Sequence, residues 1–543
     1  MKKEYLILIL IIVLGFLLRF INISNLPPSL NWDEVSHGYN AYSILKTGQD
    51  EWGQWFPITN FRAYGDYPLP LYMYLSIPWI AILGLNEISI RLTSVLLGSL
   101  TVLMVYLISK QVFKNRYAAL FSMLLLAVSP WGILTSRQVI QSTPAIFFLS
   151  LGIWLCLKGI AEKSQLLVWG AASMGLSAYA YHNTRILTPV LFFLLIIFFK
   201  KFFFAKKKFL IQIFIVGVIF FVPLIPVVFS TEGAARSSWV GILDQGAINQ
   251  INEARSTSDL PVPLPKLLNN KIVYSSIRVA ENYLGYFSPI YLGLEGGTQY
   301  QFSVPHFGII YPIELPFFYI GLIFLLAKFR KNSLNEKFIL GWLLLAPIPA
   351  AITRDPYQVV RSTIMMPALY IVTGLGVALF LDKFKSISLR NIIVIIFIVL
   401  LGWCSYLYLN NLWNDYPKQY SSAWQYGYKQ AFYLLQTKYN NYSQVLITKK
   451  YGEPHEFLLF YSQYDPQKYR SDPTLVRYQK SNWFWVDQFD KYYFINDWEV
   501  KEKLKGKNNL LLITSPGNYP QGGKVLETIN FLDGSPAFDI VAL

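Results

Sequence analysis

The chain has 543 residues, of which 54% are hydrophobic and only 14% are charged, and its mean hydropathy is +0.37. Soluble domains carry about 25% charged residues, so this composition excludes an ordinary soluble protein. Many apolar runs reach the length of about 17–25 residues that crosses a bilayer as a helix. The net charge of +16 lies largely in short loops between these runs. Membrane orientation accounts for such loops, so we expect no nucleic-acid partner.

Eleven apolar segments predict transmembrane helices, and the fold is expected to be mainly α-helical. They are residues 5–23, 88–109, 117–135, 143–160, 165–183, 186–200, 209–229, 307–327, 338–353, 363–381 and 391–409. The loops richest in Lys and Arg all fall on one side of this arrangement, which the positive-inside rule makes cytoplasmic. We therefore expect a multi-pass protein of the plasma membrane, with a cytoplasmic amino terminus and an extracytoplasmic carboxy-terminal domain.

One segment, Leu69–Leu85, is apolar but short, and it contains Pro78. A crossing at this point would move every later basic loop to the outside, so we expect the segment to lie in the outer interface. Twelve spans are the alternative. Residues 1–409 then form a transmembrane domain with outer loops at 24–87 and 230–306.

The tail, residues 410–543, has a different composition, rich in Tyr, Trp, Asn, Lys and Asp. Val445–Thr448 and Leu510–Thr514 have the β-branched and apolar composition of strands, and Ala423–Tyr439 is predicted to be a helix. The tail is therefore expected to be a small α/β domain with its own core.

The first outer loop holds three acidic residues, Asp33, Glu34 and Asp66. Acidic residues beside a bilayer are costly and commonly functional. A carboxylate can bind or deprotonate a sugar hydroxyl, and aromatic rings can cover the apolar faces of a sugar. For Asp33 the alternative is an amino-cap of a helix over Val35–Leu45. The aromatic side chains have an alternative as interface anchors; the candidates are Trp32, Tyr39 and Tyr67.

Three further outer turns carry basic residues against the charge bias: Arg137, then His182 with Arg185, then Arg361. An arginine can grip a phosphate through two hydrogen bonds. The alternatives are snorkelling to headgroups for Arg137, a structural hydrogen bond for His182, and an ion pair with Asp355 for Arg361.

The ordered set of motifs resembles the GT-C membrane glycosyltransferases, the group of protein O-mannosyltransferases and aminoarabinose lipid A transferases. The matching pieces are Trp32-Asp33-Glu34, Gly65–Tyr72, Asn86–Leu92, and Ser136-Arg137 with Ser142–Pro144. Two positions depart from the pattern. Ser142 stands where the mannosyltransferases have Asp, and Tyr67 where the aminoarabinose transferases have Lys, so their donor-phosphate contacts and metal use do not carry over intact.

The resemblance implies inverting transfer of a sugar from a polyprenyl-phosphate donor to a lipid, protein or cell-wall polymer acceptor, among membrane lipids. Asp33 is then the base, and Glu34 and Asp66 orient hydroxyls or tune Asp33. The implied donor-phosphate ligands are Arg137, Arg185 and Arg361, and the implied substrate contacts are Trp32, Tyr39, Tyr67 and His182.

No cofactor is certain, and no ligand motif such as CxxC or HExxH supports a divalent metal. The alternatives are a transporter or flippase for lipid-linked sugars, an oligosaccharyltransferase-like enzyme, and a non-catalytic scaffold that binds cell-wall polymer.

Overall fold

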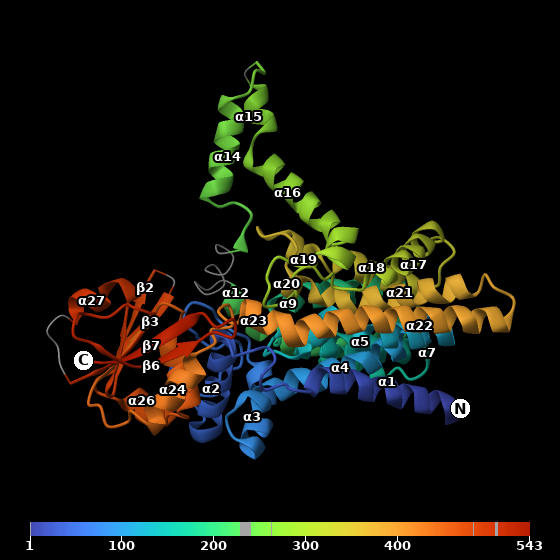
Figure 1. Ribbon diagram of the computed structural model, residues 1–543. Helices are drawn as coiled ribbons and strands as arrows, with labels where there is room; N and C mark the ends of the chain where they lie inside the picture. Colours follow the sequence, from blue (N-terminus) through green and yellow to red (C-terminus); the bar gives the residue numbers. More distant parts are fainter. Residues whose placement is uncertain (1, 229–239, 262, 482, 505–508) are drawn as a thin grey trace. The chain divides into compact units, whose positions relative to one another are not determined.

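The computed structural model describes residues 2–228, 240–261, 263–481, 483–504 and 509–543, which form two compact units (Figure 1). Unit 1 comprises Met1–Arg19, Leu96–Ser136 and Gln141–Tyr408. Unit 2 comprises Phe20–Val95, Arg137–Ile140 and Leu409–Leu543. The tail therefore shares a unit with the first outer loop, which the sequence had grouped with the transmembrane domain.

Unit 1 is helical throughout its regular structure in the described residues. Its centre is α21 (Met366–Leu381), which is buried along most of its length and packs against α5 (Arg116–Val128) and α17 (Leu315–Ala327). The other elements are α1 (Lys2–Phe20), α4 (Glu87–Phe113, shared with unit 2), α6 (Pro130–Ser136), α7 (Ser142–Ala161), α8 (Leu166–Ser177), α9 (His182–Phe198), α10 (Lys200–Ala205), α11 (Lys207–Phe221), η1 (Val222–Leu224), α12 (Ile225–Val228), α14 (Gln245–Ser256), α15 (Leu264–Leu268), α16 (Lys271–Gly285), η2 (Ile290–Leu294), η3 (Pro312–Glu314), α18 (Leu334–Leu345), α19 (Ile348–Ala351), α20 (Val359–Ser362), η4 (Thr363–Met365) and α22 (Ile387–Asn410).

Helices occur in all eleven predicted spans, but the count of eleven transmembrane helices is not confirmed. Five helices of the described chain are long and apolar enough to cross a membrane, and a sixth results if α5 and α6, bent by 53°, form one broken span. Several others are shorter apolar helices, among them α8 and α9. The long apolar helices show a multi-pass membrane protein. Residues 229–239 and 262, which fall in a predicted span and outer loop, lie outside the described residues.

The tail folds as the predicted small α/β domain, with a seven-stranded mixed sheet in the order β2-β3-β4-β1-β5-β7-β6. The central strand β1 (Val445–Thr448) is parallel to its two neighbours, and the other pairs are antiparallel. The remaining strands are β2 (Val476–Lys480), β3 (Trp483–Phe489), β4 (Tyr492–Ile495), β5 (Leu511–Thr514), β6 (Lys524–Asn530) and β7 (Pro536–Ala542).

The sheet has a hydrophobic core on each of its two faces. Successive side chains of a strand point to opposite faces, so alternate residues of β1 enter different cores. Val445 and Ile447 of β1 lie in the larger core, and Leu446 between them lies in the smaller core with Val500 of α27 (Val500–Lys503). The helical elements of unit 2 are α2 (Trp32–Thr47), α3 (Leu71–Leu83), η5 (Asn411–Asp415), α23 (Tyr416–Tyr420), α24 (Tyr428–Thr437), α25 (Pro454–Tyr461), α26 (Pro466–Ser471), η6 (Asp497–Glu499) and α27 (Val500–Lys503).

Two predicted helices differ in length from those observed. The helix predicted over Ala423–Tyr439 begins only at Tyr428, because Gln425 and Gly427 have positive φ of 55° and 112°. The helix α3 confirms a short helix in Leu69–Leu85. At 13 residues it is shorter than the roughly 17 residues that a membrane crossing needs.

The helix α2 joins the first outer loop to the tail inside unit 2. It packs on α3, α25 and α26. At Gly38 a Cβ atom would lie 2.6 Å from Cε2 of Phe460, so the missing side chain permits the close approach of α2 to α25. The helix α2 therefore packs directly against the helices of the sheet domain.

Candidate active site

The acidic pair lies in the first turn of α2, which is capped by Asn31 rather than by Asp33. The Asn31 side chain accepts a hydrogen bond from the Glu34 N–H at 2.9 Å, and Glu34 Oε2 accepts one from the Asn31 N–H at 3.2 Å. This reciprocal capping box ends the alternative in which Asp33 serves as the cap. Asp33 remains in the first turn, where the helix dipole favours a negative charge.

Asp33 is partly exposed and is held by a buried tyrosine. The Tyr64 hydroxyl donates a hydrogen bond to Asp33 Oδ1. Burial, and after it the negative charge of Asp33, raises the pKa of Tyr64 well above its ordinary value. Tyr64 therefore stays protonated and acts as a donor that fixes one oxygen of the Asp33 carboxylate.

His37 lies one helical turn after Asp33, and its Nδ1 is 2.6 Å from the Asp33 carbonyl oxygen. Because a carbonyl only accepts, Nδ1 carries the proton. Burial lowers the pKa of His37 despite the opposing charges of Asp33 and Asp66. A neutral imidazole therefore stands beside the two carboxylates.

Asp66 shares neighbours with Asp33 and is partly exposed. Its carbonyl accepts a hydrogen bond from the Ala63 N–H at 3.0 Å, which closes the turn that carries Tyr64. The charge of Asp66 acts on both His37 and Tyr64. The structure thus brings two of the three predicted acids to the same group of side chains.

Glu34, the third acid, is fully buried in an ion pair with Arg91 at the start of α4. Arg91 Nε donates to Glu34 Oε1 at 2.9 Å, and Nη2 donates to Oε2 at 2.8 Å. The Val139 N–H also donates to Oε1 at 2.9 Å. Sequence reasoning did not assign Arg91 a role, although a cation near the start of a membrane helix demands a partner.

Arg137 is fully buried within unit 2. Its Nε donates to the Leu26 carbonyl at 3.1 Å and its Nη2 to the Ile21 carbonyl at 2.7 Å. The turn that contains Arg137 also supplies the N–H of Val139 to Glu34. Arg137 thus ties together backbone segments around the acidic pair, and its predicted contact with a phosphate stays a prediction.

An aromatic wall borders Asp33. The ring centroid of Tyr64 is 6.0 Å from that of Trp32 and 5.2 Å from that of Trp483 in β3. A Cβ atom at Gly65 would collide with the Trp483 ring, so this turn needs glycine. Partly exposed rings of this kind suit the apolar face of a sugar.

Side chains of the tail hold this wall in place. The Trp483 Nε1–H donates to Glu453 Oε1 at 2.5 Å, and the Trp32 N–H donates to Gln425 Oε1 at 2.9 Å. Sequence reasoning missed Trp483, Glu453 and Gln425, because nothing local in the tail relates them to residues some 400 positions earlier.

Two of the predicted substrate contacts in unit 2 differ in exposure. Tyr67 is partly exposed next to Asp66. Tyr39 is fully buried, and its hydroxyl donates to the Tyr464 carbonyl at 3.1 Å. Burial of Tyr39 in the core offers no surface for a sugar.

The remaining predicted residues, His182, Arg185 and Arg361, belong to unit 1. His182 begins α9, and Arg185 Nε in its first turn donates to the Ala178 carbonyl at 3.2 Å. The Asn183 side chain donates to the Arg361 carbonyl at 2.8 Å. The start of α9 and the short helix α20 are therefore adjacent, so two of the predicted basic turns meet.

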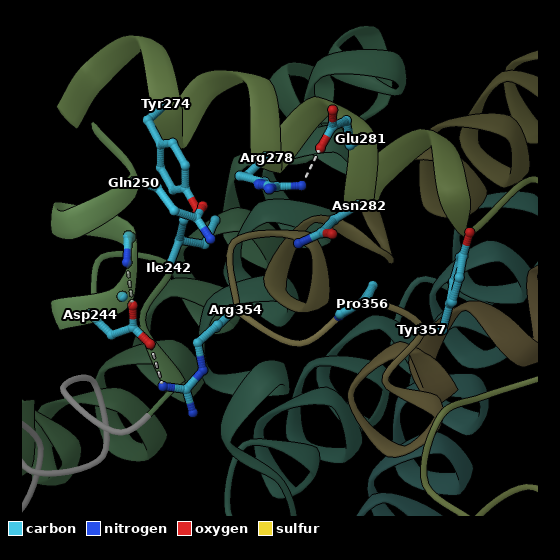
Figure 2. A pocket seen from close by; sticks show the side chains of 12 residues that line it. Ile242, Asp244, Gln250, Tyr274, Arg278, Glu281, Asn282, Arg354, Pro356 and Tyr357 are labelled. Carbon is cyan, nitrogen blue, oxygen red and sulfur yellow. Dashed lines mark hydrogen bonds and ion pairs between the residues drawn. The ribbon is translucent and has the colours of Figure 1, made fainter. Parts of the chain in front are cut away.

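A pocket of about 450 Å³ lies between α14, α16 and the turn around Pro356 (Figure 2). Its cations are paired with acids. Arg354 Nη1 is 3.0 Å from Asp244 Oδ2, and Arg278 Nη1 is 3.0 Å from Glu281 Oε2. These exposed, internally neutralised pairs do not favour a phosphate.

Residues 66–226 match the family model described as dolichyl-phosphate-mannose-protein mannosyltransferase. A curated relative, an uncharacterized protein of Aquifex aeolicus (strain VF5), is 28% identical over 171 residues, which cover 31% of this chain and 32% of the relative.

Two kinds of solved structure share the fold. ArnT from Cupriavidus metallidurans is 12% identical to this chain, and the match covers 98% of this chain and 97% of ArnT. The TM-score is 0.56 for the structure bound to undecaprenyl phosphate and 0.53 for the apo structure. The oligosaccharyltransferase AglB from Archaeoglobus fulgidus, in complex with an inhibitory peptide and a dolichol-phosphate, is 13% identical with a TM-score of 0.53. That match covers 85% of this chain and 63% of AglB. The match of residues 66–226 to the mannosyltransferase family model, together with a fold shared with ArnT and AglB, confirms the resemblance to the GT-C membrane glycosyltransferases.

Proposed function

We propose that the chain is an inverting glycosyltransferase that moves a sugar from a polyprenyl-phosphate donor to an acceptor hydroxyl at the outer face of the membrane. One observation carries the proposal. Asp33 presents a partly exposed carboxylate that is fixed by a buried tyrosine and bordered by aromatic rings. The proposed orientation keeps the amino terminus in the cytoplasm and the sheet domain outside.

In the proposed reaction Asp33 is the general base. The acceptor oxygen attacks the anomeric carbon through an oxocarbenium-like transition state, and its proton passes to the Asp33 carboxylate. The bond from the anomeric carbon to the phosphate oxygen breaks, and the phosphate leaves without needing a general acid. Such a base contributes about 10²–10⁴-fold. Asp66 and the rings of Trp32 and Trp483 position the sugar, and Tyr64 aims the base.

The donor side of the proposal rests on unit 1. Apolar side chains of α8, α9 and α11 line a groove of about 820 Å³, with Thr188 and Pro189 of α9 among them. Arg185 lies on the same helix face, three and four residues before these two. A cation one helical turn away from an apolar groove suits a phosphate with a prenyl tail. The undecaprenyl phosphate bound by ArnT supports a lipid of this class.

The remaining assignments follow from these placements. Arg361, adjacent to the start of α9, is the second proposed phosphate ligand of unit 1, and His182 is proposed to contact substrate. Glu34 and Arg137 are proposed to position the site rather than to react, because both are fully buried and hydrogen-bond to protein groups.

A second candidate function is an oligosaccharyltransferase-like reaction, which the fold shared with AglB favours. The two reactions differ in the group transferred, which is one sugar in the first and an oligosaccharide in the second. The chemical class of the labelled product would also identify the acceptor as a lipid, a protein or a cell-wall polymer.

The experiment assays transfer from radiolabelled polyprenyl-phosphate sugars in membranes that carry wild-type protein or Asp33→Asn. We expect the substitution to lower the rate about 10²–10⁴-fold, and product NMR to show inversion at the anomeric carbon. Asp533→Asn is the matched control, because Asp533 lies in the exposed β6–β7 turn. Full activity of Asp33→Asn would refute the assignment of the base. Transfer of oligosaccharides only would favour the second function.

A further inference from the structure

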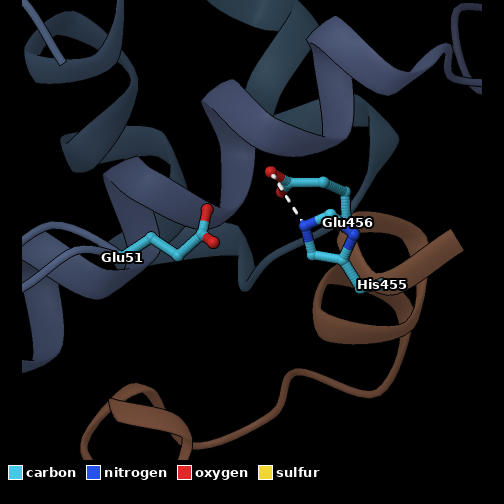
Figure 3. A group of neighbouring side chains, drawn as sticks. All are labelled: Glu51, His455 and Glu456. Carbon is cyan, nitrogen blue, oxygen red and sulfur yellow. Dashed lines mark ion pairs between the residues drawn. The ribbon is translucent and has the colours of Figure 1, made fainter. Parts of the chain in front are cut away.

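Three buried side chains of unit 2 meet outside the site described above (Figure 3). Glu51 follows α2, and His455 and Glu456 lie in α25. One potential ligand atom of each lies within 4.8 Å of the other two. The residues are 1%, 3% and 1% exposed, respectively. Figure 3 shows the two carboxylates directed toward one another, with the His455 ring beside Glu456.

Each carboxylate has an unsatisfied oxygen. Among the described residues, Oε2 of Glu51 and Oε2 of Glu456 are buried without a hydrogen-bond partner. The nearest charged contact within the group joins His455 Nε2 to Glu456 Oε1, at 3.8 Å. Buried polar atoms without partners are costly and rare in native proteins. Two such atoms beside an imidazole therefore point to a ligand that would satisfy both, in place of the proton through which the two carboxyl groups otherwise hydrogen-bond to each other.

The surrounding charges do not replace that ligand. The Arg477 guanidinium acts on Glu51 and Glu456, but it is spread over the Trp52 ring at 4.0 Å, and its Nη2 contacts the Glu51 carbonyl at 3.5 Å. Glu453 Oε2 lies 3.5 Å from His455 Nδ1 and adds another acid, and the charge of Lys449 acts on His455. Three buried acids, Glu51, Glu453 and Glu456, thus stand against two cations, Arg477 and Lys449, and this excess of negative charge favours binding of a further cation.

The donor set indicates which cation. One imidazole nitrogen and two carboxylate oxygens are ligands that zinc accepts at about 2.0–2.2 Å. Calcium and magnesium prefer oxygen-only sites, and the imidazole favours a transition metal. Zinc usually has four ligands in a tetrahedral arrangement. These two segments supply three of them, so a water molecule would complete the coordination.

We propose that Glu51, His455 and Glu456 bind one divalent transition-metal ion, zinc by its donor set, which fastens the segment after α2 to α25. The ion has a structural role. The segment before α25 carries Glu453, the hydrogen-bond acceptor of Trp483, so the ion steadies the aromatic wall without touching the reacting groups.

The test uses the full-length protein in detergent, stripped with EDTA, loaded with zinc chloride and separated by gel filtration. We expect about one zinc ion per chain by mass spectrometry of the eluted metal. His455→Ala and Glu51→Gln lose the zinc. His306→Ala, at an exposed histidine paired with Glu295, keeps it. Asp33→Asn also keeps it, which separates this proposal from that of the catalytic base.

A measurement on wild-type protein alone guards against unfolded variants. X-ray absorption at the zinc edge should show one imidazole in a shell of nitrogen and oxygen. The proposal is overturned if the wild type retains no zinc, if a folded His455→Ala protein retains as much as the wild type, or if the shell contains only water oxygens or sulfur. In the first case the carboxylates share a proton instead.

Discussion

Replacement of Glu34 by Gln separates a positioning role from a chemical one. The Glu34 carboxylate accepts hydrogen bonds from two nitrogens of the Arg91 guanidinium, at 2.9 and 2.8 Å. It also accepts hydrogen bonds from two backbone N–H groups. Its neighbour Asp33 is partly exposed and receives the Tyr64 hydroxyl. Adjacent acids with such different surroundings should respond to amide substitution in opposite ways.

The expected loss of stability follows from the buried cation. Arg91 also donates to the carbonyls of Ile23, Pro27 and Ser29, so it stays in place when its partner loses charge. Removal of one member of a buried pair costs about 3–5 kcal/mol. Asp33→Asn leaves no buried charge uncompensated, and we expect a change of about 1 kcal/mol or less.

The assay combines urea titration in detergent, followed by tryptophan fluorescence, with transfer activity per folded molecule. Glu34→Gln should lower the urea midpoint and retain activity in the folded fraction. Asp33→Asn should leave the urea midpoint nearly unchanged and lose transfer activity. The double replacement Glu34→Leu with Arg91→Met should recover most of the lost stability, since apolar pairs can replace buried ion pairs. A Glu34→Gln protein as stable as the wild type, or folded but inactive, would refute the positioning role.

Three further substitutions test neighbouring groups. Tyr64→Phe removes the donor to Asp33, and a hydrogen bond to a charged group is worth about 1.5–3 kcal/mol, so kcat should fall about 10- to 100-fold; an unchanged kcat contradicts this. Burial lowers the pKa of His37, so the unfolded state takes up the proton first and stability should fall as the pH drops below about 6.5. Melting curves of His37→Asn should show a smaller decline, and parallel curves would count against the assignment. Arg185→Gln should raise the KM for the lipid-linked donor and leave that for the acceptor unchanged; equal effects on both would exclude a donor-specific contact.

Local patterns in the sequence predicted the parts of the site that depend on nearby residues. The acids Asp33 and Asp66 could be found because charged residues are conspicuous beside apolar spans. The spacing Asn31-x-x-Glu34 is a capping-box signal, but the sequence reasoning did not use it and considered Asp33 as the cap instead.

Pairings between distant residues could not be predicted in this way. Trp32 contacts Gln425 across 393 positions, and Glu34 meets Arg91 across 57. Periodicity reports which face of an element is apolar but not which element covers it. Span lengths were also beyond reach, since hydropathy counts apolar residues and does not register that α8 is a helix of only 12 residues.

Unit 2 joins an early part of the chain to its last part. At about 5–20 residues per second, roughly 20–80 s separate the synthesis of Trp32 from that of Gln425, its hydrogen-bond partner. Throughout that interval the nascent chain carries its acidic loop without β3, so Tyr64 lacks the ring of Trp483. A half-made molecule therefore has no assembled aromatic wall. Under the proposed function, a stop codon in the tail is expected to abolish transfer while leaving most of the membrane helices intact.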